Sequence, residues 1–200
     1  MYAFRNMSKD LRAQVIACRK GKGLPWHSPP HGNMGYTGRY LISAACYEHR
    51  YYIGVSPERM SECESEILSI CEQAGYEVYA WCVLPNHYHL LLRCDAIRHF
   101  CREVGKFHGG SSKRWNQEDG QFGRKVWYRC FDREMRSARH FYASLNYIHH
   151  NPIHHGYVDK WADWLWSSAA IFLEKAGRDE AERIWREHPI HDYGKKWDVD

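Results

Sequence analysis

The sequence predicts an α+β domain built on one antiparallel sheet, with helices on one face and a further helix after the last strand. Four stretches have strand-like composition, two stretches with helical spacing of apolar residues lie between them, and a third helical stretch follows. Their order is β-α-β-β-α-β-α. This is the ferredoxin-like split βαβ arrangement with one helix added.

The first half of this arrangement ends at residue 84. The apolar stretch from Arg39 to Tyr47 is typical of a strand. Ser56 and Pro57 mark a helix start, because serine is a good N-cap and proline fits the first turn. We expect this helix to end at Gly75, and residues 76–84 to form the next strand.

The second half begins after a turn at Pro85 and Asn86. The last helix is expected to stop before Pro152, since a residue that precedes proline is disfavoured in helical conformation. The expected elements are a strand from His87 to Arg93, a helix from Ala96 to Trp115 that the Gly109–Gly110 pair could interrupt, a strand from Lys125 to Arg133, and a helix from Ser137 to His150.

Three segments of the chain differ in character. Residues 1–35 are expected to be an irregular N-terminal extension, in which Asp10 to Arg19 could form a short helix. Residues 36–156 carry the periodic patterns and form the expected core. Residues 157–200 are rich in tryptophan and charge and are the expected C-terminal appendage.

The composition is that expected of a cytoplasmic protein able to bind nucleic acid. The 200 residues have a formal charge of +4, which permits a polyanionic partner without requiring one. The eight cysteines show no C-x2-C spacing, so we interpret them as reduced thiols, which weakens the case for a zinc-stabilised structural module. No signal peptide or long apolar run is recognisable, and we expect no membrane span.

The motif His87-Tyr88-His89 is the first half of a candidate site. Side chains alternate in direction along a strand, so both imidazoles share one face and could hold one metal ion. Tyr88, Leu90 and Leu92 should then point toward a packed core. Taken alone, two histidines so spaced are more often hydrogen-bonded residues of a half-exposed sheet.

The second half of the candidate site lies on the last helix. Tyr147 and Asn151 are four residues apart, which places them on one face. Asn151 offers an amide oxygen as a third metal ligand, and Tyr147 offers a phenol beside the metal. His149 and His150 are reserve ligands. The pattern alone equally allows Tyr147 to be a core aromatic residue, as its neighbour Tyr142 could be.

Four motifs follow one another along roughly residues 38–170. They are Trp81-Cys-Val-Leu-Pro-Asn-His87-Tyr-His89-Leu-Leu-Leu, Lys125-Val-Trp-Tyr-Arg-Cys-Phe-Asp-Arg133, Tyr147-Ile-His-His-Asn151-Pro152-Ile-His-His-Gly156-Tyr-Val and Trp164-Leu-Trp166-Ser167-Ser168. In order and spacing they resemble the REP-associated tyrosine transposases, a branch of the single-tyrosine HUH transposase superfamily. Two departures are the absence of a His-x-Thr signature in the first strand and His154 at a usually basic position.

The resemblance implies metal-dependent nicking and rejoining of single-stranded DNA at repeated palindromic or hairpin DNA. Tyr147 would hold the cut strand as a 5′-phosphotyrosine ester. A divalent ion, Mg²⁺ or Mn²⁺, bound by His87, His89 and Asn151, would polarise the phosphate. The expected partner is single-stranded or hairpin DNA, with no membrane, and the protein would act as a monomer or a homodimer.

Basic and aromatic residues of the core are the expected DNA contacts, because cations bind phosphates and rings stack on unpaired bases. For any single Lys or Arg, a solvated surface position is the commoner situation. The predicted contacts are Lys106, Lys113, Arg114, Trp115, Arg124, Lys125, Trp127, Arg129 and Arg133.

Two other classes of function stay open. A catalytically inactive relative would bind nucleic acid without using Tyr147. A metal-dependent single-strand nuclease or phosphohydrolase would use another nucleophile in place of the phenol. A phosphohydrolase with a His-x-His-x-His motif is disfavoured, because Leu91 occupies the third histidine position.

Overall fold

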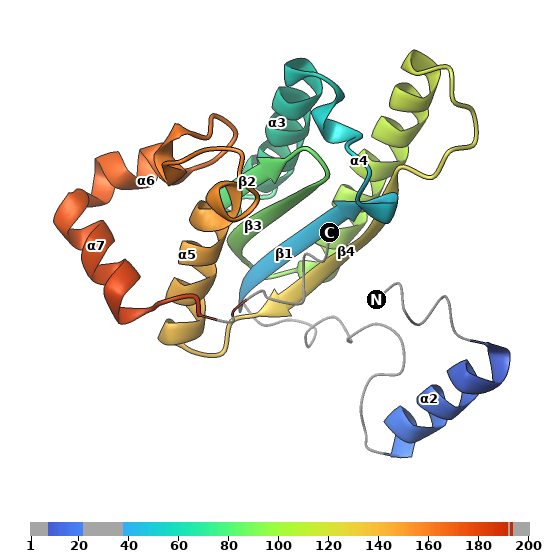
Figure 1. Ribbon diagram of the computed structural model, residues 1–200, viewed down its shortest axis with the longest axis horizontal. Helices are drawn as coiled ribbons and strands as arrows, with labels where there is room; N and C mark the ends of the chain where they lie inside the picture. The colour runs from blue at the N-terminus through green and yellow to red at the C-terminus, as the bar shows by residue number, and fades with distance from the viewer. Residues whose placement is uncertain (1–7, 22–37, 192, 194–200) are drawn as a thin grey trace. The chain divides into compact units, whose positions relative to one another are not determined.

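The computed structural model describes residues 8–21, 38–191 and 193, shown as coloured ribbon in Figure 1. The chain divides into two compact units, Met1–Gly32 and Asn33–Asp200. In the first unit the described part is helix α2 (Lys9–Gly21). This confirms the short helix predicted there, while residues 22–35 of the predicted irregular extension lie outside the described residues.

The second unit is built on a four-stranded antiparallel sheet with the strand order β2-β3-β1-β4. The strands are β1 (Gly38–Cys46), β2 (Glu77–Leu84), β3 (His87–Cys94) and β4 (Trp127–Glu134). The central strands β3 and β1 pair with each other, with β2 and β4 outside them. This order confirms the predicted ferredoxin-like arrangement.

Two helices, α3 (Pro57–Gln73) and α4 (Ile97–Glu118), cover one face of the sheet. Tyr88, Leu90 and Leu92 are fully buried on that face, as predicted. The interruption considered at Gly109–Gly110 is wrong: α4 runs unbroken for 22 residues. A glycine costs a helix only about 1 kcal/mol, and burial of the flanking Phe107 and Ser111 holds this one together.

The tyrosine-bearing helix α5 (Ala138–His154) packs over β2 and β3 on the opposite face (Figure 1). The prediction that it stops before Pro152 is wrong, because the helix continues to His154. A proline removes its own N–H from the helical ladder and crowds the preceding turn, a cost that the burial of Asn151 and Pro152 offsets here. The helix end is closed further on, where the Tyr157 N–H donates to the Pro152 carbonyl at 2.9 Å and Gly156 has φ +70°. Asn151 therefore stays in the helix.

The chain beyond α5 returns to the sheet and then forms two more helices. The N–H of Val83 donates to the Trp166 carbonyl, and the N–H of Ser168 to the Trp81 carbonyl, so residues 166–168 run beside β2. The elements of this part are η3 (Trp161–Asp163), α6 (Ala169–Ala176) and α7 (Arg178–Glu187). No helix in the described ranges is long and apolar enough to cross a membrane.

Arg59 links the start of α3 to the end of α4. Its buried guanidinium donates to Glu118 Oε2 and Asp119 Oδ2, each at 3.1 Å. The hydrogen bond from Arg59 is the main cause that lowers the pKa of Asp119. A carboxyl with a depressed folded pKa stabilises the fold above its unfolded pKa, about 3.9. That stabilisation is lost as pH falls through the folded pKa.

We therefore expect Arg59→Met to lower the free energy of unfolding by about 2–3 kcal/mol at neutral pH. This is somewhat less than for a fully buried pair, because Glu118 is half exposed. The difference from wild type should shrink as pH falls below about 4. Urea denaturation at several pH values measures both effects. Arg183→Met removes exposed ion pairs on α7 and should change stability far less; equal losses would contradict this role for Arg59.

Candidate metal and nucleophile site

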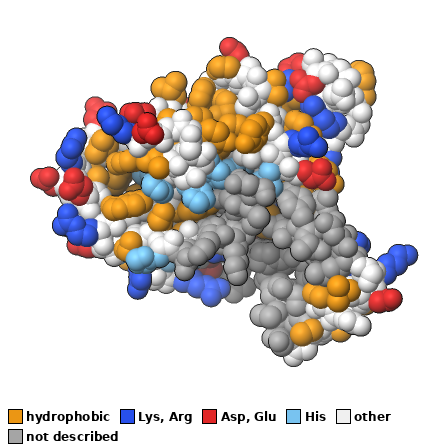
Figure 2. All heavy atoms as spheres, viewed as in Figure 1, with side chains coloured by type: hydrophobic (Ala, Val, Ile, Leu, Met, Phe, Trp, Pro, Cys, Tyr) orange, Lys and Arg blue, Asp and Glu red, His pale blue; other side chains and the backbone are white. Residues whose placement is uncertain are grey.

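His87 and His89 lie on the face of β3 that α5 covers, and both are buried. Their rings are 5.0 Å apart between centroids and inclined by 75°. The site therefore lies inside the layer between the sheet and α5. In the space-filling view, histidine side chains gather over this part of the molecule (Figure 2), where α5 alone contributes four.

The orientation of His87 is fixed by Asn86. The Asn86 Nδ2 donates to the His49 carbonyl at 3.1 Å, which leaves Asn86 Oδ1 to accept from His87 Nδ1 at 2.6 Å. That carbonyl belongs to the turn η1 (Tyr47–His49), where Glu48 and His49 both have positive φ, 57° and 51°. In the neutral tautomer that donates from Nδ1 to Asn86, Nε2 presents a lone pair.

The lone pair of His87 faces the end of α5. His87 Nε2 lies 3.1 Å from Asn151 Oδ1, which is also an acceptor. The other amide atom, Asn151 Nδ2, is buried and has no hydrogen-bond partner among the described residues. Two acceptors that face each other are a repulsive pair unless a cation or a proton lies between them. This arrangement is one in which a metal ion would satisfy both acceptors.

His89 is held in the same manner and faces the tyrosine. Its Nδ1 is 2.7 Å from Ser43 Oγ on the neighbouring strand, and its Nε2 is 3.4 Å from the Tyr147 hydroxyl. Each imidazole is thus engaged through Nδ1 by a polar neighbour, with Nε2 directed toward α5. Metal-binding histidines are commonly oriented in this way, by a hydrogen bond through the second ring nitrogen.

Helix α5 supplies both of its site residues from one face. Ser137 caps the helix, its hydroxyl accepting from the His140 N–H at 3.1 Å. Four residues apart, Tyr147 and Asn151 are buried against β3. The four predicted site residues therefore meet. The reserve ligands face elsewhere: His149 Nε2 lies 2.9 Å from Ser168 Oγ, and the His150 ring lies 5.1 Å from that of Trp185.

A metal ion here would have two imidazole nitrogens and one amide oxygen as protein ligands. No group of three or more His, Cys, Asp or Glu side chains able to hold a metal occurs in the described part of the chain. The amide of Asn151 is consequently needed for a third ligand. This mixed nitrogen and oxygen set, with further positions open to water or phosphate, fits Mn²⁺ or Mg²⁺.

Sequence reasoning missed several residues around the site. Ser43 is a small polar residue in a mostly apolar strand, and Asn86 directly precedes the histidines, so both left a signal. Tyr193 left none: its ring lies 5.8 Å from that of Tyr147, and its hydroxyl hydrogen-bonds Ser144. Burial raises the pKa of Tyr193, which keeps this second phenol protonated.

The predicted DNA contacts do not form one surface. Trp115 and Trp127 are buried in the α4 core, and their Nε1 groups donate to Glu62 and Ser111. Neither indole can stack on a base in this structure, so the interpretation of these two rings as DNA contacts is corrected: a count of aromatic residues does not reveal burial.

Several of the predicted basic contacts are committed to ion pairs within the α4 region. Arg114 pairs with Glu62, and Lys106 pairs with Glu103 at 2.9 Å. Arg124 pairs with Asp119 at 2.6 Å. Lys113 is exposed on α4, which packs on the face of the sheet opposite to the site.

The remaining basic residues belong to β4 and the turn before it. Arg133 pairs in register with Leu41, and the neighbouring Phe131 pairs with Ser43, which places both side chains on the site face of the sheet. Arg129 is exposed and lies where the pairing of β4 with β1 is irregular, so alternation along the strand does not assign its face. Lys125 Nζ lies 4.7 Å from the ring of Tyr47. Since α5 covers β2 and β3, the side of the site nearest β4 carries Arg133.

The comparisons with known proteins identify the family of the chain. Residues 41–151 match the family described as "Transposase IS200 like". The match covers more than half of the chain, so the chain belongs to this class of transposases.

Two curated relatives define the branch. A Haemophilus influenzae protein provisionally named as a REP-associated tyrosine transposase is 30% identical, over 54% of this chain and 68% of the relative. The Escherichia coli REP-associated tyrosine transposase is 25% identical, over 51% and 59%. The chain is a member of the REP-associated tyrosine transposases, which confirms the resemblance seen in the sequence.

A solved structure shows the same fold. It is a REP-associated tyrosine transposase bound to a REP hairpin, with a TM-score of 0.56 and 20% identity, covering 74% of this chain and 86% of the other. At this identity the likeness establishes the architecture alone.

Proposed function

We propose that this protein nicks and rejoins single-stranded DNA at hairpins formed by repeated palindromes, through a covalent intermediate on Tyr147. The observation that carries the proposal is the meeting of the Tyr147 hydroxyl, 3.4 Å from His89 Nε2, with the facing acceptors His87 and Asn151. The relative solved with a REP hairpin supports hairpin DNA as the substrate.

In the first step the Tyr147 oxygen bonds to the phosphorus as the bond from phosphorus to the 3′ oxygen breaks. The phenol loses a proton and the released 3′ oxygen gains one, so the step consumes neither a proton nor a nucleotide cofactor. In the second step another 3′-hydroxyl attacks the phosphotyrosine and restores the phenol. The bond energy of the phosphodiester is kept in the ester throughout.

The other residues of the site prepare this attack. A divalent ion bound by His87, His89 and Asn151 would polarise the scissile phosphate and neutralise its developing charge. Ser43 and Asn86 hold the two imidazoles through Nδ1, which keeps both Nε2 atoms directed at the reaction centre. Burial of the site limits competition from water.

The DNA strand reaches the site from the β4 side. Helix α5 covers the β2 and β3 half of the face, whereas Arg133 projects from β4 on the same face and Arg129 is exposed further along β4. Their guanidinium groups are suited to phosphate contacts. Phe131, on the same face as Arg133, is half-buried and can contact a base.

The experiment that tests this function uses hairpin DNA from the repeats that flank the gene. With Mn²⁺ present, the single-stranded hairpin form should be cut and should yield a covalent protein–DNA product, since the buried site admits only an unpaired strand. Binding should weaken steeply as salt rises, because phosphate contacts release counterions. Equal cutting of fully paired duplex, or binding that is indifferent to salt, would count against the proposal.

Ser43 gives a test of how the metal site is oriented. We expect Ser43→Ala to weaken Mn²⁺ binding by about 10- to 100-fold, because His89 loses its Nδ1 partner while the small side chain leaves the strand intact. Isothermal titration calorimetry measures the affinity. Ser69→Ala on α3, remote from the site, should leave it unchanged. Wild-type affinity in Ser43→Ala would show that this hydroxyl does not orient the ligand.

A further inference from the structure

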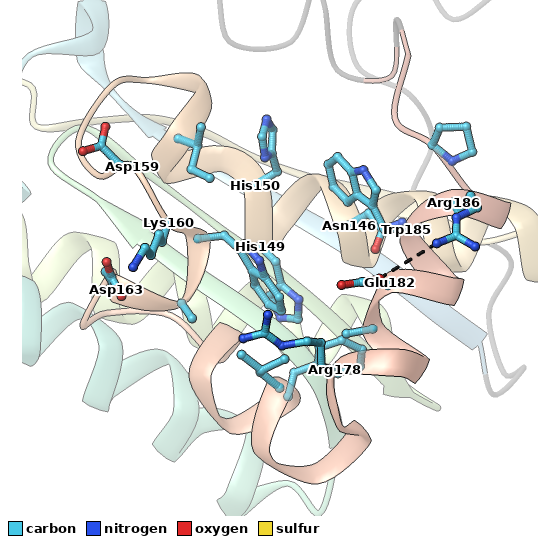
Figure 3. Close-up of a pocket in the computed structure, with 17 residues that line it drawn as sticks. Asn146, His149, His150, Asp159, Lys160, Asp163, Arg178, Glu182, Trp185 and Arg186 are labelled. Carbon is cyan, nitrogen blue, oxygen red and sulfur yellow. Dashed lines mark ion pairs between the residues drawn. The ribbon is translucent and has the colours of Figure 1, made fainter.

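A cavity of about 990 Å³ lies on the side of α5 that does not face the sheet. Its walls come from α5, the loop that contains η3, and helices α6 and α7 (Figure 3). Asn146 and His150 line it, and in the sequence of α5 they directly precede the site residues Tyr147 and Asn151. Its volume is that of a small-molecule or nucleotide site.

The cavity exists because α7 is fastened to α5 near one end. Asn146 Nδ2 donates to the carbonyls of Ile184 at 3.3 Å and His188 at 2.9 Å. At its other end, α7 turns back from α6 at Gly177, whose φ of +79° disfavours any side chain. The α6–α7 pair therefore stands away from α5 between these two points.

Aromatic rings form two walls of the cavity. On one side Trp161 stacks on His149, with centroids 5.6 Å apart and planes 24° apart, and Phe172 lies 5.1 Å from the same imidazole. On the other side Trp185 lies 5.1 Å from His150 and is 41% exposed. An exposed indole facing a stacked aromatic wall is suited to a planar ring.

The charges in the cavity specify the ligand further. Lys160 and Arg178 line the cavity and are suited to an anion, since neither side chain has an ion-pair or hydrogen-bond partner in the described ranges. Arg186 is paired with Glu182 at 3.9 Å, and two more carboxylates line the wall. The acidic and basic side chains of the cavity therefore carry no net formal charge. A cavity without net charge does not favour a polyphosphate. It favours one phosphodiester, with carboxylates free to accept hydrogen bonds from amino groups on a base edge.

We infer that this cavity binds one unpaired nucleotide of the DNA substrate, with its base against Trp185 or Trp161 and its phosphate on Arg178. The inference rests on the proposed function in taking DNA as the ligand. Because an α-helix with side chains is only about 10 Å across, a strand that passes Tyr147 can reach round α5 to the cavity. The pocket would thereby fix which phosphate is presented to the nucleophile.

The test is binding of a short single-stranded oligonucleotide that contains 5-bromodeoxyuridine, measured with EDTA so that no cleavage occurs. Trp185→Ala and Arg178→Gln should each weaken binding about tenfold, as expected for the loss of a stacked base or a phosphate contact. Phe122→Ala and Arg183→Gln are the matched controls, since both residues are exposed and outside the cavity. Photocrosslinks should map to Trp161 or Trp185.

Affinity within twofold of wild type for both variants, or crosslinks that map only to β4, would overturn the inference. Circular dichroism melts establish that the variants remain folded, which surface positions on α7 should allow. Cleavage is scored separately with Mn²⁺. If the variants bind the oligonucleotide as wild type does and the protein still forms the Tyr147 adduct, this inference alone is refuted. If the cavity variants lose binding as expected but the wild-type protein forms no adduct, the proposed function alone is refuted.

Discussion

Tyr147→Phe should abolish both DNA cleavage and the covalent protein–DNA product while leaving the fold intact. The substitution removes only the hydroxyl, which makes a long contact of 3.4 Å with His89 Nε2, so it should cost no more than about 1 kcal/mol of stability. The ring keeps its packing against β3. Loss of the nucleophile should reduce the rate below detection, because the proposed ester forms on the hydroxyl that this substitution removes.

DNA and metal binding should survive this substitution, since the phenol is not among the proposed metal ligands. Two tyrosines serve as controls. Tyr193→Phe tests the neighbouring phenol, whose ring is 5.8 Å away and whose hydroxyl is bonded to Ser144. Tyr142→Phe tests a tyrosine of the same helix. If Tyr147→Phe still cuts DNA without an adduct, a water molecule is the nucleophile and the protein is a nuclease.

His87→Ala and His89→Ala should each remove Mn²⁺ binding and lower the cleavage rate by at least about a hundredfold. Loss of a residue that hydrogen-bonds a metal ligand typically lowers metal affinity or activity by about 10- to 100-fold, and loss of a ligand itself should lower them further. Both imidazoles are buried, with Nε2 directed at the same region. Calorimetry with Mn²⁺ and a single-turnover cleavage assay measure the two effects.

His99→Ala controls for adventitious chelation, because this histidine lies on α4 and is half exposed. It should leave metal affinity and cleavage unchanged. Asn151→Ala should resemble the histidine variants, with a smaller loss, since a neutral amide oxygen contributes less to a divalent ion than an imidazole. Retained metal binding in His87→Ala with His89→Ala combined would exclude this pair as the metal site.

The central geometry of the site followed from local periodicity. Alternation along β3 places His87 and His89 on one face of the sheet. Helical spacing places Tyr147 and Asn151 on one face of α5. The sheet order brought the two faces together, because β3 is a central strand and α5 packs across it. These features depend on patterns within one element and on one well-known topology, so a single sequence contains enough information to predict them.

Other features depend on contacts between distant parts of the chain. Pro152 was expected to end α5, yet tertiary packing holds one more turn, and Asn151 keeps its place because of it. Trp127 was expected to meet DNA, yet it is buried against α4. The hydrogen bond between Asn86 and the turn at His49 joins residues 37 positions apart. No local pattern encodes such a pairing.

The most direct measurement locates the covalent bond. The protein is incubated with single-stranded hairpin DNA and Mn²⁺, the DNA is trimmed with nuclease, and tryptic peptides are sequenced by mass spectrometry. The peptide from His140 to Lys160 contains Tyr142, Tyr147 and Tyr157, so fragment ions must assign the modified residue. We expect a 5′-nucleotide phosphate on Tyr147. Cleaved DNA with the modification on another residue, or with none, would contradict a tyrosine transposase that acts through Tyr147.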